Sequence, residues 1–204
     1  MRIRSVVAAL ALALTATAFA GPPASAERGE RSLVQVLGKD GTKLDRKWGD
    51  FDIVEKAAFA VLAEKPDSPV GLLAQGDVKL TAFIPTDRAF RRLVFDLTGK
   101  RMSEKKVFAT VAGLGIDTVE AVLLYHVVPG EPITYRQAKA ANGAKLTTAL
   151  GPTIRVKVEH GRVYLIDKDP NDLNPRVVRV LKNINKGNKQ IAHGITRVLR
   201  PADL

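Results

Sequence analysis

The sequence contains no cysteine and only three histidines in 204 residues. Without cysteine the protein has no disulfide, no thiol nucleophile and no thiolate ligand for a metal ion. The histidines, His126, His160 and His193, lack the i, i+4 spacing of a helical zinc site. Composition therefore excludes thiol chemistry, and we predict neither a bound metal ion nor a cofactor.

Sequence signals of hydrolytic or nucleotide chemistry are also missing. Beyond residue 26 the only serines are Ser32, Ser68 and Ser103, and none lies in a G-x-S-x-G sequence. The stretch KGNK (186–189) is too short for a phosphate-binding loop. A pair of glycosidase carboxylates would leave no local signature, and nothing in the sequence singles one out. We therefore predict a protein that is not an enzyme.

Acidic residues are few relative to basic ones: 21 Asp and Glu face 32 Lys and Arg, for a net charge of +11. The basic residues are scattered along the chain without interleaved aromatic residues, so we do not expect a nucleic-acid partner. A positive field favours anionic partners such as cell-wall polymers, acidic polysaccharides or lipid headgroups. Such partners would imply association with the cell wall or with the membrane surface. The alternative is that the charge only keeps the protein soluble.

The first 26 residues have the pattern of a secretory signal peptide. Arg2 and Arg4 precede an apolar run over residues 6–20, and Ala24-Ser25-Ala26 forms a small-x-small cleavage site. The run is shorter than the ~20 residues that span a bilayer as a helix, which favours cleavage over a membrane anchor. We predict cleavage after Ala26, secretion to the extracellular space, and a net charge lowered from +11 to +9 by the loss of two arginines.

The rest of the chain divides into a charged leader (27–47) and one domain (48–204). The leader is expected to be flexible, with at most one docked segment at 33–37. Hydrophobic periodicity predicts helices that begin near residues 50–52, 86, 103, 117 and 134, and strands at 78–84, 153–159, 162–167, 176–184 and 194–199. The buried run LLYHVVPG (123–130) is interpreted as a central strand. This order, helices first and strands later, indicates an α+β fold.

Three segments, in order, resemble the motifs of the fasciclin-like domain family. The opening segment LTAFIPTDRAF (80–90) is similar to the first motif, LLYHVVPG to the tyrosine–histidine motif, and IAHGITRVLRP (191–201) to the closing motif. The closing motif usually begins Asn-Gly, where this chain has Lys189 and Gln190, and an acid is replaced by Thr196. The motif residues that match are Thr81, Phe83, Pro85, Thr86, Phe90, Tyr125, His126, His193 and Pro201.

The resemblance implies a wedge-shaped α+β domain, with helices from the N-terminal half packed on a β-sheet or sandwich built mostly from the C-terminal half. It also implies adhesion at cell surfaces or in matrix, with a protein or polysaccharide partner. In relatives the tyrosine–histidine segment contacts receptors, which transfers to Tyr125 and His126. We add Lys182, Lys186 and Lys189 as an accessory basic edge.

Two other interpretations of the polar residues stay open. Tyr125, His126 and His193 could be buried structural groups bonded to the backbone, or could line the pocket of a secreted enzyme or accessory protein. Asp167, Asp169 and Asn171 have the spacing of calcium ligands, but the loop lacks the Gly and Glu of an EF-hand. We interpret this loop as a turn with Asx turns at Asp167 and Asn171.

Overall fold

The computed structural model describes residues 28–39, 41 and 43–202. The predicted signal peptide and its cleavage site lie outside these residues. The helical elements in chain order are α1 (Leu33–Leu37), α2 (Asp52–Glu64), η1 (Pro69–Ala74), α3 (Asp87–Thr98), α4 (Glu104–Ala112), α5 (Ile116–Tyr125), α6 (Tyr135–Ala140) and η2 (Arg179–Leu181). The strands are β1 (Leu80–Pro85), β2 (Val127–Pro129), β3 (Lys145–Thr147), β4 (Thr153–Glu159), β5 (Arg162–Ile166) and β6 (Gln190–Ile195).

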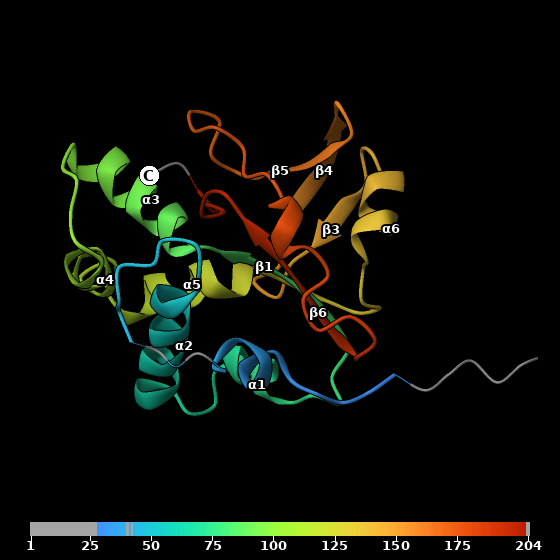
Figure 1. Cartoon of the computed structure of the whole chain (residues 1–204), viewed down its shortest axis with the longest axis horizontal. Coiled ribbons are helices and arrows are strands. Elements are labelled where there is room, and N and C mark those ends of the chain that lie inside the picture. The colour runs from blue at the N-terminus through green and yellow to red at the C-terminus, as the bar shows by residue number, and fades with distance from the viewer. Residues whose placement is uncertain (1–27, 40, 42, 203–204) are drawn as a thin grey trace, which may run out of the picture.

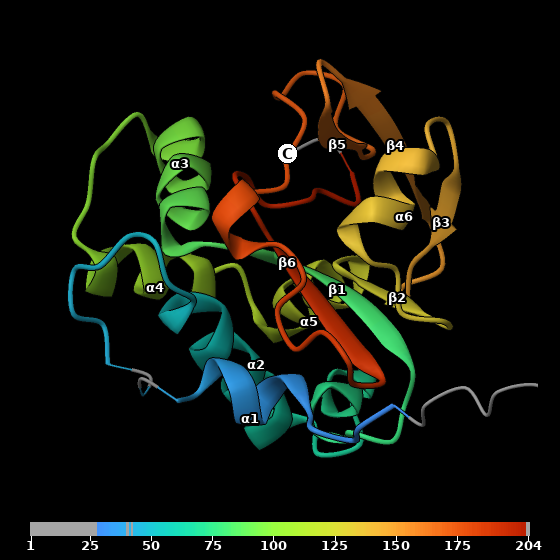
Figure 2. The same cartoon turned by 45° about the vertical axis from the view of Figure 1, so that its right-hand side comes forward.

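Strand β1 is the centre of the fold. It pairs antiparallel with β2 and parallel with β6, with Leu80 opposite Gln190 and Pro85 opposite Ile195. Figure 2 shows β1 and β6 side by side through the middle of the molecule. Every residue of both strands is buried, because helices cover one face and the second sheet covers the other. The alternation of residue types in 78–84 therefore reflects two different apolar environments on the two faces of β1, and neither face is exposed.

The core is divided into layers by this sheet (Figure 1). On one side, α2, α3, α4 and α5 pack on one another around buried residues such as Ile53, Phe90 and Leu123. On the other side, the sheet β3-β4-β5 packs on Phe83 and Ile195 of the central strands. The predicted α+β arrangement, with helices from the N-terminal half and the second sheet from the C-terminal half, is confirmed.

The β4–β5 hairpin has one apolar and one polar face. Alternate residues of β4, such as Ile154 and Val156, enter the core, whereas Arg155 and Lys157 are exposed. The turn between the strands is tight, and both His160 (φ 48°) and Gly161 (φ 71°) have left-handed backbones. This conformation matches the right-handed twist of the strands, as the sequence predicted for a His-Gly hairpin.

The segment before residue 48 is partly built into the domain. The docked segment at 33–37 is confirmed as helix α1, whose Leu33 is fully buried. The side-chain oxygen of Gln190 accepts a 2.8 Å hydrogen bond from the Leu33 N–H, and Gly29 forms a parallel bridge with Asn188. Gly76 passes so close to this segment that a Cβ would lie 1.5 Å from the carbonyl oxygen of Glu30. The fold therefore extends to the N-terminal side of residue 48.

Three strand predictions were wrong, at 123–130, 176–184 and 194–199. Residues 176–184 form short bridges at Val177 and Ile184 around helix η2, because Gly194 packs against the Leu181 side chain and leaves no room for a straight strand. The run 123–130 is not one strand: helix α5 continues to Tyr125, and β2 begins only at Val127. In addition, β6 ends at Ile195, so residues 196–199 continue without strand pairing.

In the described part of the chain, no single helix is long and apolar enough to cross a membrane. Helices α4 and α5 meet that criterion only when joined, and they are bent by 104° at the break between them.

Candidate functional site

Tyr125, at the end of α5, is fully buried. Its hydroxyl donates a 3.2 Å hydrogen bond to the carbonyl oxygen of Thr153, which fastens α5 to β4. Burial, with a smaller effect of the Asp167 carboxylate, raises the pKa of the Tyr125 hydroxyl to about 12. The side chain is therefore a neutral hydrogen-bond donor inside the core, and it is not placed where a partner protein could touch it.

His126 is also buried, and both of its ring nitrogens have backbone partners. Nδ1 donates to the carbonyl oxygen of Val122 (2.7 Å), because Nε2 accepts from the N–H of Leu199 (2.9 Å). Burial lowers the pKa of His126 to about 4, although the bond to Val122 favours the protonated form. This neutral imidazole connects the tyrosine–histidine motif to the closing motif.

His193 has the same kind of environment on β6. Its Nε2 donates to the carbonyl oxygen of Ile133 (2.8 Å), and Nδ1 accepts from the N–H of Asn183 (3.3 Å). Its ring stacks on Phe83 with centroids 5.7 Å apart. Burial lowers the pKa of His193, so this ring is neutral as well.

The remaining motif residues hold the same region of the core together. The hydroxyl of Thr81 accepts a 2.8 Å hydrogen bond from the Ile133 N–H. Thr86 is the N-cap residue of α3, and Phe90 in the next turn is buried among the helices. Pro85 ends β1, whereas Pro201 lies half-buried after the closing motif. These motif residues therefore have structural roles: they form hydrogen bonds, cap a helix or are buried in the core.

The three lysines of the predicted basic edge lie in the segment that leads into β6. Lys182 and Lys186 are exposed, and the Lys182 Nζ lies 5.1 Å from the centre of the Tyr135 ring. Lys189 is half-buried and forms an ion pair of 2.6 Å with Glu30. The structure separates this edge from Tyr125 and His126, since the latter two are enclosed in the core.

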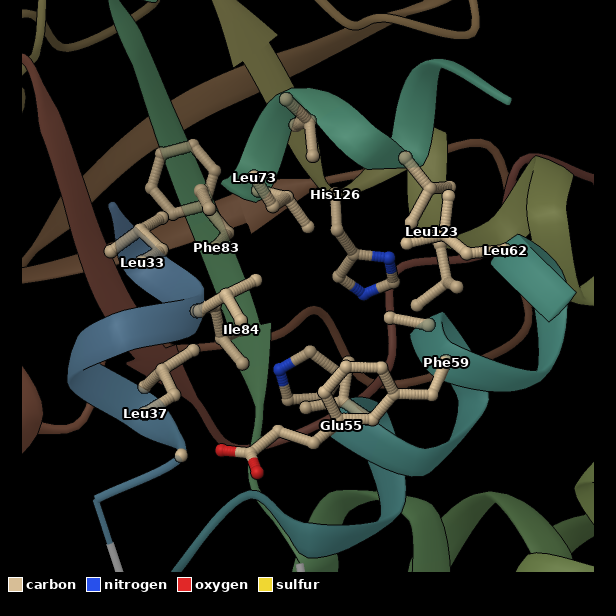
Figure 3. A pocket seen from close by; sticks show the side chains of 18 residues that line it. Leu33, Leu37, Glu55, Phe59, Leu62, Leu73, Phe83, Ile84, Leu123 and His126 are labelled. Atoms are coloured by element: carbon tan, nitrogen blue, oxygen red, sulfur yellow. The ribbon is translucent and has the colours of Figure 1, made fainter. Parts of the chain in front are cut away.

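An apolar cavity of about 70 Å³ lies between α1, α2 and β1. Figure 3 shows that Leu33, Leu37, Phe59 and Ile84 are among its lining side chains, together with His126 and Glu55. Cavities that enclose organic ligands usually measure about 300–1,000 Å³. The space is therefore small for a substrate, although it adjoins a histidine and a carboxylate.

The largest polar depression is an open groove of about 470 Å³ on the outer face of the β4–β5 hairpin. Lys157 on β4 pairs with Tyr164 on β5, and Tyr164 forms a bridge with Arg176. These three side chains therefore form a row across the sheet. The full lining is Arg92, Lys157, Glu159, Tyr164, Ile166, Leu173, Asn174, Arg176, Thr196 and Arg197.

Arg92 of α3 closes the opposite side of this groove. Its guanidinium donates a 2.9 Å hydrogen bond to the Thr196 carbonyl oxygen, whose backbone N–H donates to the Arg176 carbonyl oxygen (3.0 Å). Burial, and then the positive charges of Arg197 and Arg88, lower the pKa of Arg92. The guanidinium groups are thus held close enough to repel one another, and an anion placed between them would relieve that repulsion.

The groove lining was not found from the sequence. The signal was present in the alternation of 153–166, which places Lys157 and Tyr164 on the outward face of the predicted hairpin. The contributions of Arg92 and Arg176 carry no such signal, because they come from a helix and an irregular segment that only the fold brings beside the hairpin.

The loop suggested as a calcium site is instead an ion-pair cluster. Asp169 binds the buried guanidinium of Arg200 (2.8 Å), and Arg197 binds Asp172 (2.7 Å). The Asx turn at Asp167 is confirmed, since its side chain accepts from the Asp169 N–H. A second turn of this kind occurs at Asp169, which accepts from the Asn171 N–H, and not at Asn171 as predicted.

Comparison with known proteins places this arrangement in a family. The fasciclin domain family matches residues 58–201. One similar solved structure is a FAS1 domain pair from the insect cell adhesion molecule Fasciclin I, with 19% sequence identity and a TM-score of 0.48. The match covers 73% of this chain and 45% of that one, so this chain spans less than half of that domain pair. No curated protein matches the chain significantly. The match over most of its length shows that this chain belongs to the fasciclin domain family.

Proposed function

We propose that this protein is a secreted binding module, without catalytic activity, that attaches to an acidic polysaccharide of a cell surface or matrix. The observation that carries the proposal is the groove lined by Arg92, Lys157, Arg176 and Arg197. Lys157 also pairs with Glu159 (3.3 Å) and Arg197 with Asp96 and Asp172 (3.0 and 2.7 Å), so Arg92 and Arg176 are the main candidates for binding the polymer. Glu159 is the only acidic residue in that lining. Arginine binds carboxylate and sulfate groups in a two-pronged geometry, which suits polymers that carry one acid group per sugar unit.

Membership of the fasciclin domain family supports an adhesive role, and the basic composition supports an anionic partner. The shape of the groove supports a polymer, because it is wide and open to solvent along the sheet. The two nitrogens of His126 and of His193 are engaged by the backbone, which supports binding over catalysis at those residues. We therefore move the contact site from Tyr125 and His126 to the groove.

The test is binding of polygalacturonate and heparin to the chain from residue 27, with neutral dextran as a third polymer. We expect both acidic polymers to bind, with an affinity that falls as salt is raised, and dextran not to bind. The double variant Arg92→Gln/Arg176→Gln should bind at least about tenfold more weakly, since each lost charge-assisted hydrogen bond contributes about 1.5–3 kcal/mol.

The matched control is Lys182→Gln/Lys186→Gln, which removes the same net charge from exposed positions outside the groove. It should lower the affinity much less than the groove variant does. Equal losses in the two variants would mean that only the overall charge attracts the polymer. Thermal melting of both variants must match the parent protein, so that weaker binding reflects the surface and not the fold.

A further inference from the structure

Four carboxylates meet at a buried point between the helices. Asp50 precedes α2, and Asp52, Asp87 and Glu104 lie in the first turns of α2, α3 and α4. Each can bring one oxygen within 4.8 Å of the others. Asp87 is 0% exposed and Glu104 1% exposed, so these two acids are withdrawn from water.

Helix capping accounts for only part of this arrangement. One oxygen of Asp87 accepts a 3.0 Å hydrogen bond from the Ile53 N–H, and one oxygen of Glu104 accepts a 2.7 Å bond from the Arg46 N–H. The second oxygens, Asp87 Oδ2 and Glu104 Oε1, are buried and have no hydrogen-bond partner, and Asp50 Oδ1 is in the same state. A buried acceptor without a donor is costly, so these three oxygens need either a proton shared between the carboxyl groups or a cation.

The charges are not balanced by basic side chains. In the residues that the structure describes, no lysine or arginine forms an ion pair with Asp50, Asp87 or Glu104. Burial, and then the neighbouring carboxyl groups of Glu104 and Asp50, raise the pKa of Asp87 to about 9. Without a cation, the cluster therefore keeps a proton at neutral pH; with one, all its members can ionise.

We propose that Asp50, Asp52, Asp87 and Glu104 form a calcium site that joins the first turns of three helices. Calcium takes six to eight oxygen ligands at 2.3–2.6 Å, so ligands on opposite sides of the ion lie about 4.6–5.2 Å apart. The four oxygens all lie within 4.8 Å of one another, which is compact enough for them to surround one calcium ion. The donor set, carboxylates alone, is also the chemistry that calcium prefers.

The ion has a route from solvent. Asp50 is half-buried, and it lines an open depression of about 380 Å³ together with Gly49 and Phe51. The backbone around Asp50 is fixed on α3, because the Asp50 and Trp48 carbonyl oxygens accept from the Asp87 and Arg88 N–H groups, each at 3.0 Å. The outer ligand is thus held in place before the ion arrives, which lowers the entropy lost on binding.

The experiment is calorimetric titration of the chain from residue 27 with calcium chloride, together with thermal melting in calcium and in EDTA. We expect one ion per chain, a dissociation constant of about 10⁻⁴–10⁻³ M as for extracellular calcium modules, and a higher melting temperature in calcium. Magnesium chloride should bind more weakly. No heat with calcium up to about 10 mM, together with equal melting temperatures in calcium and EDTA, would overturn the proposal.

Variants separate this site from general charge effects. Glu104→Gln keeps the acceptor for the Arg46 N–H but removes one negative ligand, and Asp87→Asn does the same toward Ile53. Each should weaken calcium binding at least about tenfold and abolish the shift in melting temperature, while the metal-free protein stays folded. Glu64→Gln, at an exposed position on α2, should leave both unchanged. Unaltered calcium affinity in Glu104→Gln would show that the ion binds elsewhere.

Discussion

The backbone N–H of Leu199 donates a 2.9 Å hydrogen bond to Nε2 of His126 inside the core. The two residues belong to the second and third family motifs, so one imidazole joins segments that are distant in sequence. Because the other ring nitrogen donates to Val122, the ring has a single tautomer with the proton on Nδ1. This relationship explains why a histidine is required at a position that no partner can reach.

We predict that His126→Ala is destabilising by about 3 kcal/mol, because it leaves the buried Leu199 N–H without an acceptor and opens a cavity. His126→Gln should lose less stability, since the side-chain carbonyl of glutamine can accept a hydrogen bond from the Leu199 N–H. Urea unfolding followed by circular dichroism measures both. An alanine variant as stable as the glutamine variant would contradict a role for this hydrogen bond.

The contribution of His126 to stability should also depend on pH. Its pKa is about 4 in the folded state and about 6.5 when unfolded, so the unfolded chain binds the proton first as pH falls. The stabilisation is complete above pH 6.5 and is lost as pH falls toward 4, by an amount on the order of 3 kcal/mol. The difference in unfolding free energy between the parent and His126→Gln, measured between pH 7 and 4, should shrink accordingly. A constant difference would contradict a neutral buried ring.

The contribution of Asp87 to stability should have the opposite pH dependence when calcium is absent. Its raised pKa, about 9 against 3.8, means that the folded state holds a proton that the unfolded state releases. This contribution is complete below pH 3.8 and is lost as pH rises toward 9. In EDTA, the parent should therefore lose stability relative to Asp87→Asn between pH 5 and 8. Chemical denaturation across that range is the measurement, and a difference independent of pH would show that Asp87 is ionised without metal.

The segment before residue 48 should contribute measurably to the stability of the domain. Leu33 is fully buried, and Gln190 holds its N–H while donating to the Leu72 and Gln75 carbonyl oxygens. We expect Leu33→Ala to lower the free energy of unfolding by about 2–5 kcal/mol, the usual range for a buried leucine. Val36→Ala, at a half-buried site on the same helix, is the comparison variant and should cost clearly less. Equal stability of the two variants would show that α1 is not docked in solution.

The ion pair between Asp169 and Arg200 offers a fifth test. Although burial opposes ionisation, hydrogen bonding from Arg200 holds the pKa of Asp169 below its ordinary value. Asp169→Asn keeps the Asx-turn acceptor but removes the charge, and we predict a loss of about 2 kcal/mol by thermal unfolding. Addition of calcium should not restore this loss, since the loop already has its cation in Arg200.

Much of this fold could be predicted from sequence, because the residues at helix ends and turns favour the same local structure that the packing of the core requires. Thr86 and Gly99 mark the two ends of α3, and the His160-Gly161 turn marks a hairpin. The failures occur where the tertiary context decides. Residues 176–184 have the residue types of a strand, but they bend around Gly194 and take only isolated bridges. Val177 is buried beside β6, whereas Val180 is exposed to solvent, so the segment does not form a ladder.

The groove and the carboxylate cluster could not be predicted from the sequence for a related reason. The sequence singles out Tyr125 and His126 because polar side chains stand out in an apolar run, yet such residues are also what a core needs to bond its backbone. The groove and the carboxylate cluster arise from residues on separate elements, such as Arg92 and Arg176, or Asp50 and Glu104. Only the folded arrangement brings them together.

The parallel pairing of β1 with β6 has a consequence for biosynthesis. The central strand is made by residue 85, but its parallel partner is completed only at residue 195. During synthesis β1 therefore has one unpaired edge for most of the chain's length, and contacts of such long sequence separation form slowly. The main sheet therefore cannot close until residue 195 has been made, and folding of the central layer must wait for nearly the whole chain.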